Sequence, residues 1–187
     1  MQFLLYICSS FVLFNGLIQG GFGLEYAEHP KNAIIPIFAM IFSSLVSWPI
    51  VHYVLAMFGF GVFGVFLVFP ISVVSCVFIV KVSALFRGNP HEELEPRLFS
   101  GFNGIAFFSA FQTVLFAQTA LQALLFALGG AVGFVCIIMI VSGIQKRSDI
   151  EAVPQFFMGQ PLLLVSTGLV SLIFTELLPM VIHLFTR

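Results

Sequence analysis

Charged side chains are scarce in this chain. Asp, Glu, Lys and Arg together make up 8% of its 187 residues, whereas hydrophobic residues make up 60%. A soluble domain carries roughly 25% charged residues, so this composition excludes a soluble catalytic domain and indicates a single transmembrane domain over residues 1–187. The net charge is −1 and there is no basic patch. The partner implied is therefore the lipid bilayer, and nothing suggests nucleic acid.

Residues in metal-binding patterns are also missing. The three cysteines, Cys8, Cys76 and Cys136, each stand alone in an apolar run without a CxxC pair. We interpret them as small apolar residues of membrane helices and expect no metal site. The N-terminus has no Lys or Arg before Lys31 and no small-residue cleavage motif, which predicts a retained first span.

Long hydrophobic runs are what the chain does have. A helix needs roughly 20 apolar residues to cross the bilayer, and the runs are continuous, without the alternation of membrane strands. The sequence therefore predicts an all-α fold with six transmembrane helices. Their approximate ranges are 2–24, 33–56, 62–86, 98–118, 120–144 and 157–185.

The basic residues predict the orientation of these spans. Six of the seven fall in or beside the loops that join spans 1 and 2, 3 and 4, and 5 and 6, and only Arg187 falls on the other face. The positive-inside rule places these three loops in the cytoplasm and both termini outside. Three spans per half make residues 1–86 and 98–185 inverted repeats. The six basic residues are Lys31, Lys81, Arg87, Arg97, Lys146 and Arg147.

An Asn-Gly pair occurs at equivalent places in the two halves. Asn15-Gly16 and Asn103-Gly104 lie 88 positions apart (103 − 15), each in a Phe-Asn-Gly sequence. Broken apolar segments in matching positions point to a site at the membrane midplane, so we expect spans 1 and 4 to be broken there. The polar residues near these breaks would satisfy the freed backbone groups or line an ion or electron path. They are Asn15, Gln19, Asn103 and Gln112.

One carboxylate stands apart from the loops. Glu176 is the only acidic residue well inside a predicted span, three residues before Pro179. A carboxylate in the membrane is costly unless it is paired, hydrated or protonated, so Glu176 is a candidate ion or proton site. The alternative is a carboxylate near the outer interface, because Arg187 ends the chain 11 residues later.

The C-terminal quarter resembles a known family. The residues Ser142-Gly143-Ile144-Gln145-Lys146-Arg147, Val153-Pro154, Gly159 and the run from Thr167 to Phe174 resemble the matching segment in membrane subunits of the Rnf/Nqr ion-translocating electron-transport complexes. The likeness is closest to the A-type subunit of Rnf and the E-type subunit of Nqr.

This resemblance implies a role in a redox-driven Na⁺ or H⁺ translocating oxidoreductase that joins NADH to ferredoxin or quinone. The implied location is the bacterial cytoplasmic (inner) membrane. The implied partners are the other subunits of the complex, among them a homologous six-helix membrane subunit. This chain alone would hold neither the flavin nor the NADH site, so it would not be an enzyme by itself.

The resemblance also implies where a cofactor would lie. Paired subunits of the family hold a 2Fe-2S cluster through one cysteine in each of spans 1 and 4. The matching positions here are Glu25 and Gly104, and neither offers the thiolate that such clusters use. We therefore expect this chain to carry no cofactor.

Two other functions remain open. The missing thiolates favour a structural or assembly scaffold without a cluster. The paired Asn-Gly sequences favour a stand-alone transporter of ions or small solutes with inverted repeats.

Overall fold

The structure is a computed structural model in which every element is helical, with no strand among the residues that it describes. This confirms the all-α class. The described residues are 7, 10, 11, 21–28, 30–55, 57–59, 63–87, 101–148 and 159–186.

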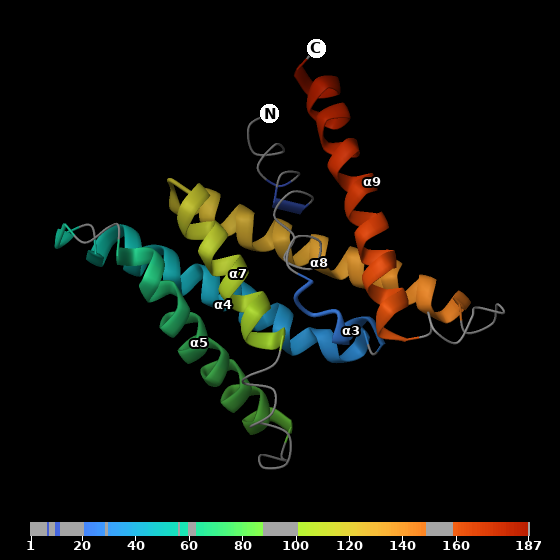
Figure 1. Ribbon diagram of the computed structural model, residues 1–187. Coiled ribbons are helices and arrows are strands. Elements are labelled where there is room, and N and C mark those ends of the chain that lie inside the picture. Colours follow the sequence, from blue (N-terminus) through green and yellow to red (C-terminus); the bar gives the residue numbers. More distant parts are fainter. Residues whose placement is uncertain are drawn as a thin grey trace.

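Five long helices form most of the molecule (Figure 1). They are α4 (Ile34–Pro49), which continues into the π-helix η2 (Ile50–Leu55), α5 (Gly64–Arg87), α7 (Gly101–Phe116), α8 (Ala120–Ser148) and α9 (Gln160–Thr186). Two short elements, α3 (Glu25–Glu28) and the 3₁₀-helix η1 (Pro30–Ala33), precede α4.

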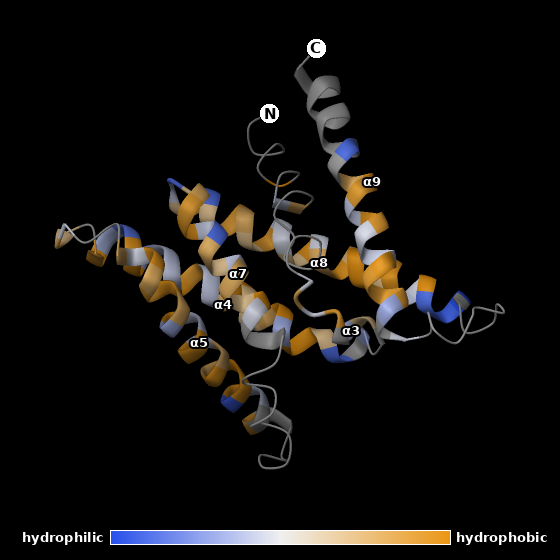
Figure 2. Ribbon diagram, viewed as in Figure 1, coloured by the Kyte–Doolittle hydropathy of each residue, from blue (hydrophilic) through white to orange (hydrophobic). Residues whose placement is uncertain are grey.

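Three of these helices are long and apolar enough to cross a membrane. They cover Ile34–Leu55, Gly64–Ser83 and Ala120–Arg147, and shorter apolar helices cover Gly104–Phe116 and Pro161–Phe174. Hydrophobic colours accordingly dominate the ribbons in Figure 2. The helices coincide with five of the six predicted segments, whereas most of segment 2–24 lies outside the described residues. The six-span inverted arrangement remains a prediction.

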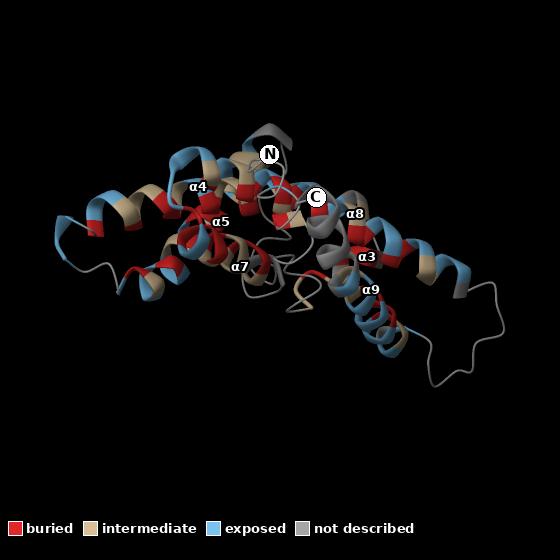
Figure 3. Ribbon diagram, turned by 90° about the horizontal axis from the view of Figure 1, so that it is seen from above, coloured by how far each residue is buried: buried red, intermediate tan, exposed pale blue. Residues whose placement is uncertain are grey.

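Helix α4 is central because it packs against α5, α7 and α8, while α9 packs against α8. Small side chains line the contact of α4, α5 and α7, where Ala39, Cys76 and Ala106 form one buried cluster. Figure 3 shows the buried positions gathered on the facing sides of these helices. Small residues let membrane helices approach closely, and van der Waals contact then supplies much of the attraction between them.

The prediction that span 4 is broken at Asn103-Gly104 is wrong. Helix α7 is continuous from Gly101 to Phe116 and includes both residues. Gly104 lies in the first turn of this helix, where it serves a packing contact described below. The expected break at Asn15-Gly16 lies outside the described residues.

Irregular backbone does occur in the last residues of the first predicted span, 2–24. Gly21 and Gly23 have φ values of +65° and +83°, a left-handed conformation that glycine adopts without steric cost. The turn leads into α3 through hydrogen bonds from Tyr26 N–H to Gly23 O and from Ala27 N–H to Leu24 O, both 3.0 Å. Non-helical backbone at membrane depth is tolerated where protein surrounds it, and Gly23, Tyr26 and Ala27 are buried.

Candidate functional site: a polar cavity between α4, α7 and α8

A small cavity with a partly polar lining lies between α4, α7, α8 and the N-terminal residue Ser10. Its polar residues are Ser10, Ser109, Gln112 and Thr113. Ser10 and Thr113 are 1% exposed, and Gln112 is 7% exposed. Apolar residues complete the wall: Met40, Ile105, Phe108, Phe126, Gly130 and Phe134.

Hydrogen bonds hold the hydroxyl groups in place. Ser10 Oγ donates to Phe126 O at 2.6 Å, and Thr113 Oγ1 donates to Ser109 O at 2.8 Å. Ser109 Oγ lies 2.8 Å from Ser44 Oγ on α4. A hydroxyl that donates its hydrogen still has lone pairs for accepting another bond. The cavity therefore presents oxygen atoms that can accept a hydrogen bond or contact a cation.

The volume of the cavity limits what it can hold. The space open to the centre of a water-sized sphere is about 10 Å³. A cavity needs about 10–15 Å³ by this measure to hold one water molecule. The site is thus close to the size of one water molecule or one bare monovalent ion, and is too small for an organic solute in this conformation.

The serines of α4 join this site to the neighbouring helix. Ser43 Oγ donates to Ala106 O at 2.8 Å, and Ser44 Oγ donates to Met40 O at 2.9 Å in addition to its contact with Ser109. Both α4 serines are fully buried. Ser43, Ser44 and Ser109 thus supply hydroxyl groups where α4 meets α7.

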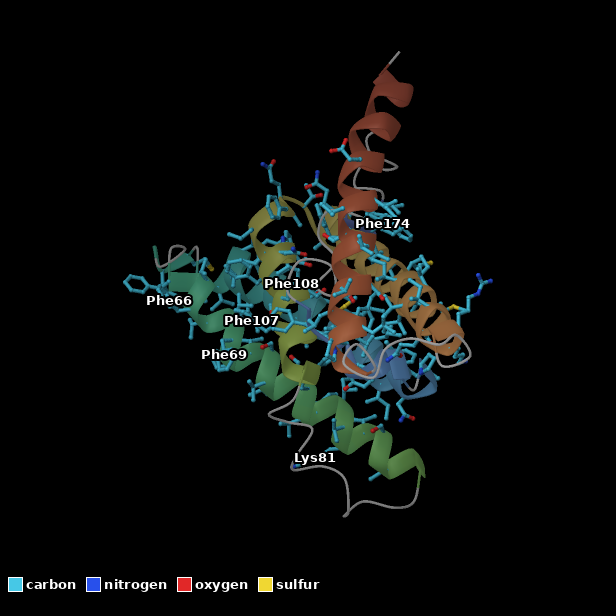
Figure 4. The ribbon with its side chains drawn as sticks, turned by 45° about the vertical axis from the view of Figure 1, so that its right-hand side comes forward. Phe66, Phe69, Lys81, Phe107, Phe108 and Phe174 are labelled. Atoms are coloured by element: carbon cyan, nitrogen blue, oxygen red, sulfur yellow. The ribbon has the colours of Figure 1, made fainter. Side chains whose placement is uncertain are left out.

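The glycine turn packs against residues of the cavity wall. A Cβ atom at Gly23 would lie 2.5 Å from Ile105 Cδ1 and 2.9 Å from Phe134 Cζ, two residues that line the cavity. The rings of Phe22 and Phe108 lie 5.8 Å apart. Figure 4 shows Phe108 on α7, with Phe107 directed instead toward Phe69 of α5. The irregular segment thus contacts three residues of the cavity wall, Ile105, Phe108 and Phe134.

The sequence-predicted site residues are only partly brought together. Gln112 lines the cavity, and Gly104 contacts the turn through Phe22. Asn103 lies in α7 and Glu25 begins α3, but their side chains lie outside the described part. Glu176 is exposed on α9 and does not line the cavity. Asn15, Gly16 and Gln19 lie outside the described residues.

Sequence reasoning missed three polar residues of the cavity, Ser10, Ser109 and Thr113. Ser and Thr are common in membrane helices, where their hydroxyls often bond to a carbonyl of their own helix, so they attract little notice singly. The spacing of Ser109, Gln112 and Thr113 at i, i+3 and i+4 was an available signal, since it places all three on one face of a helix.

The ring of Phe22 lies against Gly104, one of the two positions expected to match the family's cluster ligands. A Cβ atom at Gly104 would lie 2.9 Å from Phe22 Cε1 and closer still to Phe22 Cδ1. The ring therefore fills the space into which a ligating side chain at residue 104 would extend. Among the described residues, no three His, Cys, Asp or Glu side chains are grouped for a metal ion. Cys76 and Cys136 are free thiols, and Cys76 packs with Ala39 and Ala106.

Comparison with known proteins gives similarity at low identity. No family model matches the chain. It is 23% identical over 150 residues to the A-type subunit of the ion-translocating oxidoreductase complex of Azoarcus sp. (strain BH72), a match that covers 73% of this chain and 72% of the relative. The protein of the same name from Syntrophotalea carbinolica is 42% identical over 53 residues, 28% of each chain. The match to the first relative therefore covers most of the chain at low identity, and the match to the second covers a short segment at higher identity.

Proposed function

We propose that this chain is a membrane subunit of an Rnf/Nqr-like ion-translocating oxidoreductase complex, in which redox chemistry between NADH and ferredoxin or quinone drives Na⁺ or H⁺ across the membrane. The two relatives, both named as subunits of an ion-translocating oxidoreductase complex, support this proposal. The all-helical architecture with apolar helices of membrane-spanning length is consistent with it.

The observation that carries the ion-handling part is the cavity lined by Ser10, Ser109, Gln112 and Thr113. Residues 33–80 and 98–145 contain no Asp, Glu, Lys or Arg, so a cation inside that part of the chain would meet neutral oxygens such as those of Ser109, Gln112 and Thr113. Hard cations and water both bind such oxygens. The cavity lies beside the glycine turn, where the backbone departs from helical geometry.

The electron path of the complex is proposed to avoid this chain. Gly104 has no side chain and Phe22 fills the adjoining space, which supports a subunit without its own 2Fe-2S cluster. The flavin and NADH sites are accordingly assigned to other subunits.

A homologous six-helix subunit is the proposed partner within the membrane. The exposed faces of α5, α8 and α9 are apolar, as expected for helices that meet lipid or other membrane helices. Glu176 lies six residues after buried Val170, which places it on the face of α9 turned away from α8. A carboxylate on that face would be stabilised by a polar group of a neighbouring subunit.

Purification from the native host in a gentle detergent tests the proposal. We expect mass spectrometry to find a second six-span homologue together with flavin-binding and NADH-binding subunits. Recovery of this chain alone would contradict the complex and favour a stand-alone transporter.

A pair of variants tests the cavity within that complex. Gln112→Leu replaces a buried amide, whereas Gln118→Leu changes an exposed residue between α7 and α8. We expect Gln112→Leu to reduce NADH-driven ion uptake into membrane vesicles while Gln118→Leu leaves it unchanged. Equal uptake in both variants would show that ions do not pass through this cavity and would favour a scaffold role. The same assay identifies the ion. Uptake that requires Na⁺ and survives a protonophore indicates Na⁺, whereas uptake that a protonophore abolishes indicates H⁺.

A further inference from the structure

Two buried polar atoms near the junction of α4 and η2 have no hydrogen-bond partner among the residues that the structure describes. They are Ser47 Oγ and His52 Nδ1, and Ser47 is fully buried. Ser43 and Ser44 of the same helix are also fully buried, but each has a partner. Buried polar groups are nearly always hydrogen-bonded, so such exceptions point to a bound water, an ion or a functional site.

The helix changes form between these two residues. The α-helix ends at Pro49 and a π-helix runs from Ile50 to Leu55. Pro49 has no N–H, so the carbonyl of Leu45 loses its usual helical donor, and Ile50 N–H instead donates to Ser47 O. π-Helical turns are rare and occur frequently at functional sites. The change of helical form therefore lies between the two unpartnered side chains.

Trp48 holds His52 in a fixed position. Their rings stack with centroids 4.7 Å apart and planes inclined by 18°. The indole is itself anchored, because Trp48 Nε1–H donates to Ala117 O at 2.7 Å and the ring of Tyr53 meets it edge-on at 5.6 Å. The stack and the indole hydrogen bond together fix the orientation of the imidazole ring.

Among the described residues, no charged side chain lies beside His52. The described helices packed against it or against Trp48 are α4, α5, α7 and α8. The charged residues of α5 begin at Lys81, about 25 Å along the helix from its Gly64 end, which adjoins Val51. Figure 4 shows Lys81 at the opposite end of α5 from Phe66. Lys146 and Arg147 lie in the last turn of α8, whereas Trp48 packs near its start, at Ala123. Tyr53 is the other titratable group in contact with the stack.

We propose that Ser47 and His52 form a proton-binding site. A water molecule supplies the partners that Ser47 Oγ and His52 Nδ1 lack, and the imidazole takes up a proton from water at this end of α4 and returns it there. Uptake converts the neutral ring to an imidazolium against the Trp48 face, with no electron transferred. The site goes beyond the proposed function and holds whether or not the chain works within an oxidoreductase complex.

The chain contains a single tryptophan, and this makes the test direct. A protonated imidazole stacked on an indole quenches its fluorescence, so the emission of the purified full chain reports the state of His52. We expect a reversible loss of emission on acidification from about pH 8 to pH 5, the range in which histidine changes charge. His52→Gln and His52→Phe should both abolish this change. The second variant keeps an aromatic ring against Trp48, and gel filtration checks that each is folded.

A serine pair separates the proposed site from ordinary packing. Ser47→Ala removes the unpartnered hydroxyl, and we expect it to shift the midpoint of the fluorescence titration. Ser44→Ala removes a hydroxyl that is already hydrogen-bonded in the same helix, and should leave the midpoint unchanged. Emission that does not depend on pH, a titration that survives both His52 substitutions, or equal midpoints in Ser47→Ala and Ser44→Ala would each overturn the proposal.

Discussion

The aromatic ring of Phe22 lies directly against Gly104, in the space that any larger side chain at residue 104 would occupy. The ring is also confined by Phe108, at a centroid distance of 5.8 Å. This contact joins the glycine turn at the end of the first predicted span to the first turn of α7. It explains why a glycine stands in a continuous helix.

The first prediction follows from this contact. Gly104→Ala should destabilise the chain by about 1–3 kcal/mol, because the added methyl group overpacks the site and Phe22 must move. Thermal unfolding of the purified chain in detergent measures the effect. Gly143→Ala is the matched control, since Gly143 is exposed within α8 and a Cβ there meets nothing within 4 Å. The control should be neutral or slightly stabilising. Equal losses in the two variants would show that the Phe22 contact is not tight.

The second prediction concerns iron. Because Phe22 fills the space beside Gly104, we expect the purified chain, alone or with its partner, to hold no 2Fe-2S cluster between spans 1 and 4. Cys76→Ala and Cys136→Ala should then leave the redox activity of the complex nearly unchanged. Stoichiometric iron, with an electron paramagnetic resonance signal that disappears in either variant, would show that a cluster is held elsewhere in the fold.

The third prediction concerns the contact of α4 with α7. Ser43→Ala removes the bond to Ala106 O and should cost about 0.5–1 kcal/mol, close to the value typical of membrane helices. Ser43→Leu should cost more, about 1–3 kcal/mol, because the position is fully buried. Ser83→Ala is a suitable comparison, since the Ser83 hydroxyl donates within its own helix, to Val80 O, and its loss should have little effect. Thermal unfolding in detergent measures these effects, and we expect the unfolding temperature to fall in the order Ser83→Ala, Ser43→Ala, Ser43→Leu. A Ser43→Leu variant as stable as Ser83→Ala would contradict the close packing of α4 against α7.

The fourth prediction concerns orientation. The six-to-one distribution of basic residues places reporter fusions after Arg87 and Arg147 in the cytoplasm and a fusion after Arg187 outside. Alkaline phosphatase and green fluorescent protein fusions, which are active on opposite sides of the membrane, measure this directly. A C-terminal fusion that reports the cytoplasm would rule out the three-plus-three arrangement in the predicted orientation.

Part of the site could be anticipated from the sequence and part could not. Gln112 was a candidate because an amide near the expected break of span 4 could satisfy freed backbone groups or line a polar path, and it lines the cavity. The Asn103-Gly104 pair suggested a helix break, yet α7 continues through it. A glycine is needed both where a helix breaks and where a ring approaches closely, and only the packing of Phe22 distinguishes the two.

The sequence by itself determined the helical class and the positions of five helices. In long apolar runs the backbone must satisfy its own hydrogen bonds, and a helix does this locally, so run length and polar interruptions are sufficient. The tertiary structure alone decided which side chains meet. Ser10 bonds to Phe126, 116 residues away, and Ser43 bonds to Ala106, 63 residues away. Such pairs depend on how helices cross, which is set by the summed packing of many small residues, and no local pattern in the chain specifies it.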